Sequence, residues 1–140
     1  MMKKYALKMI IFLTIIYKIF ILSGCSIEEI NRTKVCDLEY MVLSEGEVPA
    51  ELKIQIEEKK AADFKLTYRD DAYLYIVRGY GEKETGGYSI GVRECYLTTN
   101  AVVFCTELVG PRKGETVNRN PSFPYIVVKL DNQAENVVFE

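Results

Sequence analysis

The 140-residue sequence contains no histidine and no tryptophan. Without histidine, the chain lacks the side chain that most often serves as a general base near neutral pH and as a metal ligand. Internal repeats, low-complexity tracts and internal linkers are missing as well. About half of the residues are hydrophobic (49%) and 27% are charged, which is typical of a globular protein and excludes wholesale disorder. The length suits one domain with a modest core.

Carboxylates, hydroxyls and thiols are present, but none forms a recognisable catalytic or metal-binding arrangement. Asp70 and Asp71 are adjacent, so in a strand they would point to opposite faces, and a turn accounts for them better. Ser89 lies in Gly-Tyr-Ser-Ile-Gly, but a nucleophile elbow needs a strand-to-helix turn and a histidine. Thiols without histidine do not have the spacing of a zinc site. We therefore predict a protein that is not an enzyme and needs no metal or cofactor.

The N-terminus has the pattern of a targeting segment. Three lysines (Lys3, Lys4 and Lys8) precede an apolar run over residues 9–22, which Lys18 interrupts. This run is too short and too broken for a comfortable membrane span. It ends in Leu-Ser-Gly-Cys, which matches the lipobox of bacterial lipoproteins. The motif predicts a signal peptide over residues 1–24 and lipidation of Cys25; an uncleaved signal anchor with a coincidental cysteine is the alternative.

Cleavage of this leader would change the charge of the protein. It would remove four of the 18 basic residues and none of the 20 acidic ones, which leaves a formal net charge of −6. A negative domain argues against nucleic acid as a partner and against electrostatic docking on anionic lipid. Acyl chains would hold the protein instead, with about 0.8 kcal/mol per buried CH₂. We expect a lipid-anchored protein on the outer face of the bacterial cytoplasmic membrane.

The mature chain is predicted to consist of a polar tether over residues 25–34 and one β-rich domain over residues 35–140. Pro49, an early acidic residue and two late lysines favour a helix over residues 49–60. Alternation and apolar runs predict strands over residues 35–43, 64–68, 72–80, 88–97, 102–109, 126–130 and 137–139. The run at 126–130 is apolar on both faces and is therefore expected to be central. The fold class is mainly β (α+β): an antiparallel sandwich or partly closed barrel with one helix.

The hairpin formed by residues 88–97 and 102–109 can be tested against its own side chains. One register places Arg93 opposite Glu107 and Cys95 opposite Cys105. The same register sets Tyr96 opposite Phe104 and Val92 opposite Leu108, so it satisfies charged, aromatic and aliphatic pairs together. Opposed cysteines can reach disulfide distance, and disulfides persist in exported proteins. The register therefore predicts a Cys95–Cys105 disulfide, whereas a reducing habitat would leave both thiols free.

A glycine-rich stretch, residues 78–91, connects two predicted strands. Its glycines mark a tight turn or a close backbone approach, and the simplest interpretation is a hairpin connection. The flanking tyrosines have an apolar face and a polar tip, which suits a loop that a rigid scaffold presents to a partner. The candidate partner-binding residues are Tyr80, Gly81, Gly86, Gly87 and Tyr88.

Three segments in order resemble the C-terminal domain of the PrcB family. They are Gly-Gly-Tyr-Ser-Ile at residues 86–90 followed by an alternating strand, Gly-Pro at 110–111, and Phe-Pro-Tyr-Ile-Val-Val-Lys at 123–129. Phe123 stands where the family has a tyrosine. The resemblance covers roughly residues 73–130. It implies a non-catalytic accessory subunit, often a lipoprotein, of the kind that associates with and stabilises a cell-surface subtilisin-type protease; it supplies no catalytic residues.

Two functions follow from these observations. The first is a surface lipoprotein that binds or stabilises another surface or secreted protein, such as a protease, through strand edges and the tyrosine-flanked loop. The second is a module that binds small molecules or envelope glycans on a tyrosine-lined concave surface. A hydrolase would require a convergent polar site that the sequence does not supply.

Overall fold

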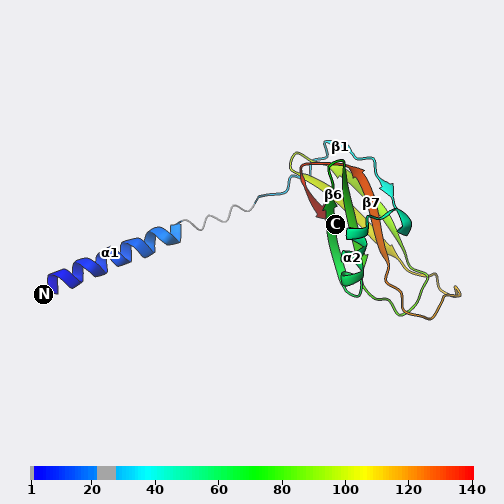
Figure 1. Cartoon of the computed structure of the whole chain (residues 1–140), viewed down its shortest axis with the longest axis horizontal. Coiled ribbons are helices and arrows are strands. Elements are labelled where there is room, and N and C mark those ends of the chain that lie inside the picture. The colour runs from blue at the N-terminus through cyan, green and yellow to red at the C-terminus, as the bar shows by residue number, and fades with distance from the viewer. Residues whose placement is uncertain (1, 22–27) are drawn as a thin grey trace.

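The computed structural model describes residues 2–21 and 28–140 (Figure 1). Helix α1 (Met2–Ile21) covers the basic and apolar part of the predicted leader. The Leu-Ser-Gly-Cys motif with Cys25 lies outside the described residues. Within residues 2–21 and 28–140, no helix combines the length and the apolar character needed to cross a membrane.

The domain is a sandwich of two four-stranded sheets with a helix on one side. The sheet orders are β1-β5-β6-β8 (sheet A) and β2-β7-β4-β3 (sheet B). The elements are β1 (Cys36–Asp37), β2 (Met41–Val42), a 3-10 turn (Glu45–Glu47), α2 (Ala50–Lys59), β3 (Asp63–Arg69), β4 (Tyr73–Tyr80), β5 (Ser89–Leu97), β6 (Ala101–Val109), β7 (Tyr125–Asp131) and β8 (Asn136–Phe139). The mainly β, α+β prediction is confirmed as a sandwich, and the two sheets do not close into a barrel.

Two apolar clusters hold the three layers together. The first fills the space between the sheets and includes Phe104 and Ile76, which are fully buried. The second packs α2 onto the outer face of sheet B through Leu52 and Ile56, which are also fully buried. β4 contributes to both clusters because its alternate side chains point to opposite faces. β7, predicted to be central, does the same from its place between β2 and β4.

The predicted strand over residues 35–43 is wrong as a single element. β1 pairs with β5 in sheet A, whereas β2 pairs with β7 in sheet B. Between them the chain crosses from one sheet to the other, and Leu38 packs against the core between the sheets. The apolar composition of this segment therefore reflects a crossing strand pair, which alternation alone could not distinguish from one continuous strand.

The predicted register of the β5–β6 hairpin is also wrong. Cys95 lies opposite Phe104 and Cys105 lies opposite Glu94, with a bulge between Val92 and Glu94. Because successive residues in a strand point to opposite faces, this one-residue shift separates the two thiols across the sheet. Cys95 packs between the sheets, and both cysteines are free thiols, so the geometric basis of the predicted disulfide is lost.

The correct register still brings one predicted pair together. Arg93 lies in the bulge, and its Nη1 is 3.8 Å from Glu107 Oε2. The remaining opposed pairs differ from the prediction: Tyr96 lies opposite Val103, and Val92 lies opposite Thr106. One further departure from an all-antiparallel fold is β8, which pairs parallel to β6.

The last part of the predicted tether is bonded to the domain. Asn31 donates two hydrogen bonds to the β5–β6 turn: its backbone N–H donates to Asn100 Oδ1 at 3.0 Å, and its Nδ2 donates to Thr99 Oγ1 at 3.0 Å. Asn100 in turn donates to the Glu29 carbonyl at 2.9 Å. Arg32 forms an ion pair with Glu140 at 2.8 Å. The chain therefore joins the sandwich at the end that carries this turn.

Candidate functional site

The two ends of the sandwich are built differently. At the turn end, short connections over residues 70–72, 98–100 and 132–135 join the strands. At the loop end, the β4–β5 connection (residues 81–88) and the longer β6–β7 connection (residues 110–124) lie together, at the lower right of Figure 1. The segment that begins at Glu28 enters at the turn end, so the loop end is the far end of the domain from the chain entry.

The two long loops are bonded to each other. Lys83 and Ser122 exchange backbone hydrogen bonds at 2.8 and 2.9 Å, and the Gly86 N–H donates to the Asn118 carbonyl at 2.7 Å. Ser122 Oγ also donates to the Thr85 carbonyl at 2.6 Å. The glycine-rich loop is therefore one half of a two-loop platform, and not a simple hairpin turn.

Two of the predicted contact glycines have a structural reason to be glycine. Gly87 has φ +87°, and a Cβ there would lie 2.6 Å from Val117 Cγ1 and 3.1 Å from Pro111 Cβ. Gly81 has φ +73° and is buried against the backbone of the α2–β3 connection, where a Cβ would lie 3.1 Å from Asp63 N. Both conformations are disfavoured for side chains with a Cβ. The glycines allow the loop to pack against its neighbours.

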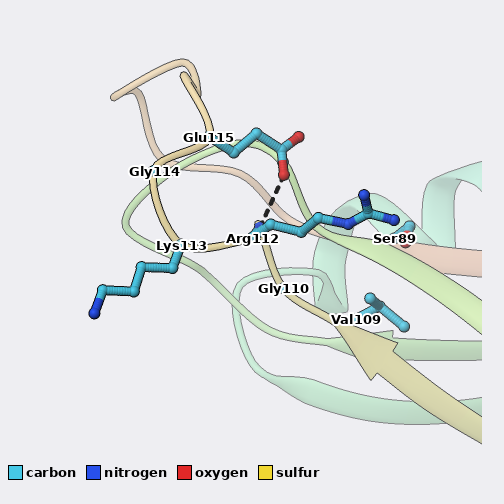
Figure 2. A pocket seen from close by; sticks show the side chains of 8 residues that line it. Ser89, Val109, Gly110, Arg112, Lys113, Gly114 and Glu115 are labelled. Carbon is cyan, nitrogen blue, oxygen red and sulfur yellow. Dashed lines mark hydrogen bonds between the residues drawn. The ribbon is translucent and has the colours of Figure 1, made fainter.

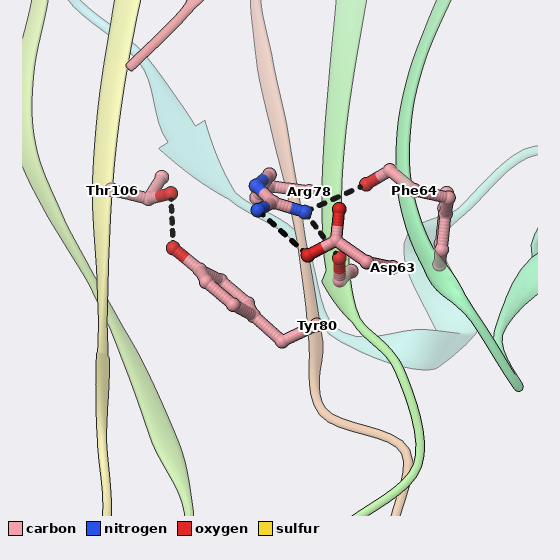
Figure 3. A network of polar contacts seen from close by, with 6 residues as sticks. Asp63, Phe64, Arg78, Tyr80 and Thr106 are labelled. Atoms are coloured by element: carbon pink, nitrogen blue, oxygen red, sulfur yellow. Dashed lines mark hydrogen bonds and ion pairs between the residues drawn. The ribbon is translucent and has the colours of Figure 1, made fainter.

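Tyr80 joins the two sheets. Its hydroxyl is 2.7 Å from Thr106 Oγ1 on β6, and the Arg78 guanidinium lies 4.2 Å from its ring centroid (Figure 3). Arg78 also donates to Asp63 Oδ2 at 2.9 Å, and this hydrogen bond lowers the pKa of the Asp63 carboxyl below its ordinary value. The polar tip of Tyr80 is therefore used inside the domain. Its predicted role in partner binding stays a prediction, as does that of Tyr88, which lies half-buried beside Gly110.

A hollow of about 580 Å³ opens beside this platform (Figure 2). Small residues form much of its lining, and Val109 is 48% exposed at its edge. The loop closes on itself through Glu115, which accepts a hydrogen bond from the Arg112 N–H at 2.8 Å. The lining residues are Gly87, Ser89, Val109, Gly110, Arg112, Lys113, Gly114 and Glu115.

Two basic side chains at the hollow are available for a ligand or a partner. The Lys113 side chain extends away from the loop, and the Arg112 side chain extends toward Ser89 (Figure 2). In the part of the chain that the structure describes, neither head group has an ion pair or hydrogen bond. Neither residue is among the partner-binding candidates predicted from the sequence. Their association with Gly87 could not be found from sequence, because it depends on how the two loops pack.

A second tyrosine-rich surface lies on the outer face of sheet B, beyond α2. Tyr68, Tyr75, Lys129 and Met41 occupy directly opposed positions across all four strands. The Tyr68 and Tyr75 ring centroids are 5.7 Å apart. Tyr73 adds an exposed ring with Lys129 Nζ 4.4 Å from its centroid. A smaller hollow of about 280 Å³ lies alongside, with Tyr40 and Tyr73 in its lining.

The buried Cys95 thiol does not add reactive chemistry to either surface. Burial, with a smaller contribution from Asp37, raises the pKa of the Cys95 thiol to about 11, so it is protonated and inert at neutral pH. Among residues 2–21 and 28–140, no cluster of cysteine and carboxylate side chains has the arrangement of a metal site.

The described domain thus combines a small β-sandwich, a two-loop platform and an open hollow. Residues 74–131 match the family model described as PrcB C-terminal. This match supports the PrcB family assignment for the segment, as the resemblance in the sequence indicated. The match runs from β4 to the end of β7 and so includes both loops of the platform. No curated protein and no solved structure matches the chain.

Proposed function

We propose that the protein is a non-catalytic accessory subunit that binds and stabilises a partner protein through its loop end. The observation that carries this proposal is the hollow beside the paired loops, where Arg112 and Lys113 extend without partners of their own in the described residues. Both loops lie inside the segment matched by the family model. Guanidinium and ammonium groups beside a small-residue floor suit an acidic segment of a partner.

The position of the loop end fits a membrane-anchored protein. With lipid on Cys25, the chain would leave the membrane and join the domain near Glu29, at the turn end. The loop end would then face away from the membrane, toward proteins outside the cell. The PrcB family suggests an extracellular subtilisin-type protease as the partner, and we adopt this as the first candidate.

Crosslinking in intact cells tests this proposal. The full chain would carry a tag after Glu140, and crosslinked proteins would be purified in detergent and identified by mass spectrometry. We expect one surface or secreted protein to dominate, and Arg112→Glu to remove most of it. Lys59→Glu is the matched control, because Lys59 is an exposed cation on α2, far from the hollow in sequence and outside its lining. Recovery of the chain alone, or equal loss in both variants, would contradict the proposal.

The tyrosine-rich surface of sheet B supports a second candidate function, the binding of a small molecule or an envelope glycan. Its exposed ring, Tyr73, borders the hollow of about 280 Å³, and sugars stack on such rings. Lys129 already lies over one face of this ring, which leaves less of it for a ligand. Binding of cell-wall fragments by the full chain, lost in Tyr73→Ala and kept in Arg112→Glu, would favour this function over the first.

A further inference from the structure

One sheet edge differs from the other three in length. The edge strands β1 and β2 have two residues each, and β8 has four, whereas β3 has seven. Short edge strands are one way in which proteins prevent pairing with other chains. β3 is therefore the longest edge strand of the described sandwich, and its length needs a separate explanation.

The backbone of β3 is available for pairing on its outer side. Tyr80 N–H donates to the Pro124 carbonyl, so the even-numbered residues of β4 bond to β7 and the odd-numbered ones bond to β3. The hydrogen bond from Asp70 N–H to the Tyr73 carbonyl fits the same alternation. The even-numbered residues of β3 thus face β4. Its odd-numbered residues, 63 to 69, direct their N–H and C=O groups away from the sheet, and no described residue bonds to them there.

Charged side chains on an edge strand usually prevent it from pairing with another chain, but the charged side chains of β3 contact other residues of the same domain. Lys65 Nζ lies 5.8 Å from the centroid of the Phe139 ring. Arg69 donates to the carbonyls of residues 133 and 135 at 3.3 and 2.7 Å. Asp63 is paired with Arg78 at 2.9 Å. These contacts leave the outer backbone of β3 open despite three charged residues in seven.

The sequence of β3, Asp-Phe-Lys-Leu-Thr-Tyr-Arg, is complementary to itself in the antiparallel direction. With Leu66 opposite its own copy, Asp63 lies opposite Arg69 and Lys65 lies opposite Thr67. These are the outward-facing residues, so their backbone groups can bond in this register, and it sets no two like charges opposite one another. Shifting this register by one residue would place the outward-facing backbone groups of one copy opposite the inward-facing backbone groups of the other.

We propose that two copies of this chain pair through β3, antiparallel about Leu66, so that the two B sheets form one continuous sheet. This arrangement is a closed, two-fold symmetric interface in which the free backbone N–H and C=O groups of each β3 strand bond to those of the other. The occupant of the β3 edge is a second copy, and β3 lies outside the segment matched by the family model.

Cysteine crosslinking of the full chain in native membranes tests this register. In a Cys36→Ser background, which removes the one exposed native thiol among the described residues, Leu66→Cys places two thiols on the symmetry axis. Opposed residues in a non-hydrogen-bonded pair have Cα atoms about 4.5 Å apart, within disulfide reach. Oxidation with copper–phenanthroline should give a species of twice the chain mass, roughly tenfold more than with the control Thr67→Cys, whose copies lie diagonally and beyond that reach.

A second pair of variants checks the same register without relying on Leu66. A chain that carries both Lys65→Cys and Thr67→Cys should again form the crosslink between copies, because position 65 of one copy lies opposite position 67 of the other in the proposed pair. Thr67→Pro in the Leu66→Cys background should reduce it, since it removes an outward N–H that the monomer does not use. Circular dichroism of each variant would verify the fold. Equal yields for Leu66→Cys and Thr67→Cys, or crosslinking only to another protein, would overturn the proposal.

Discussion

At the turn end, short connections are closed by side chains that bond to backbone within the same turn, whereas at the loop end two long connections bond to each other. Asp70 accepts the N–H groups of Ala72 and Tyr73, and buried Thr98 accepts that of Ala101. The platform at the loop end depends instead on contacts such as that between Gly87 and Val117. The turn end thus stabilises each hairpin by itself, while the loop end is only as stable as the fit between two segments distant in sequence.

Gly87→Ala should have the largest effect, because it disrupts that fit. It would place a Cβ at positive φ and 2.6 Å from Val117, so we expect a loss of about 3 kcal/mol in the free energy of unfolding. Urea denaturation would measure it. Gly114→Ala is the matched control: it has φ +82° and no atom within 4 Å of its Cβ, and should cost about 1 kcal/mol. Equal costs would show that the loops do not depend on their mutual packing.

Thr98→Val should have the next largest effect, at the turn end. It removes the acceptor of the buried Ala101 N–H while keeping the shape of the side chain. Leaving such a group unsatisfied costs about 1–3 kcal/mol, which thermal or urea unfolding would detect. Thr98→Ser keeps the hydroxyl and should restore most of this loss. If Val and Ser behave alike, the turn is not held by this hydrogen bond.

Acid should weaken the turn end through Asp70. The N–H groups of Tyr73 and Ala72 lower the pKa of its carboxyl, so the folded protein holds this proton less readily than the unfolded chain. The stabilisation is fully present above the unfolded-state pKa, about 3.9, and is lost as pH falls through the lower folded value. Asp70→Asn keeps an acceptor but cannot ionise, so its stability should fall less steeply between about pH 5 and pH 2. Asp70→Ala should also be weaker at pH 7, because the turn loses its acceptor.

Lys113→Ala should have the smallest effect on stability, within about 0.5 kcal/mol, because its side chain extends into solvent. Crosslinking to the partner should nevertheless decrease. A large loss of stability would mean that Lys113 belongs to the structure of the loop end and not to its binding surface.

The sequence predicted local structure better than it predicted pairing. Periodicity and capping predicted the helix at residues 49–60, the central apolar strand and the order of strands from Phe64 onward. The structure contains these elements as α2, β7 and β3 to β8. The β5–β6 register failed because a bulge adds one residue, and side-chain matching cannot detect an insertion that leaves Arg93 near Glu107. The prediction of one strand over residues 35–43 failed because β1 and β2 join different sheets, and both sheets take apolar residues from this short segment.

The candidate site was found only in part. Glycines between two strands correctly indicated a close backbone approach, and Gly87 shows the reason. The second loop, with Val117 and Ser122, carries no local signal of that contact. The tyrosine surface around Tyr75 and Lys129 required the strand order, because residues more than fifty positions apart share a face only after β4 and β7 pair.

The sharing of β4 and β7 between both apolar clusters has a consequence for the dynamics of the protein. Separating α2 from sheet B, or sheet A from sheet B, uncovers one face of the same two strands. Their amide protons should therefore exchange with solvent only when the whole domain opens. The two-residue strands β1 and β2 should exchange through local opening, many times faster. The domain should therefore behave as one cooperative unit with fraying confined to its first strands.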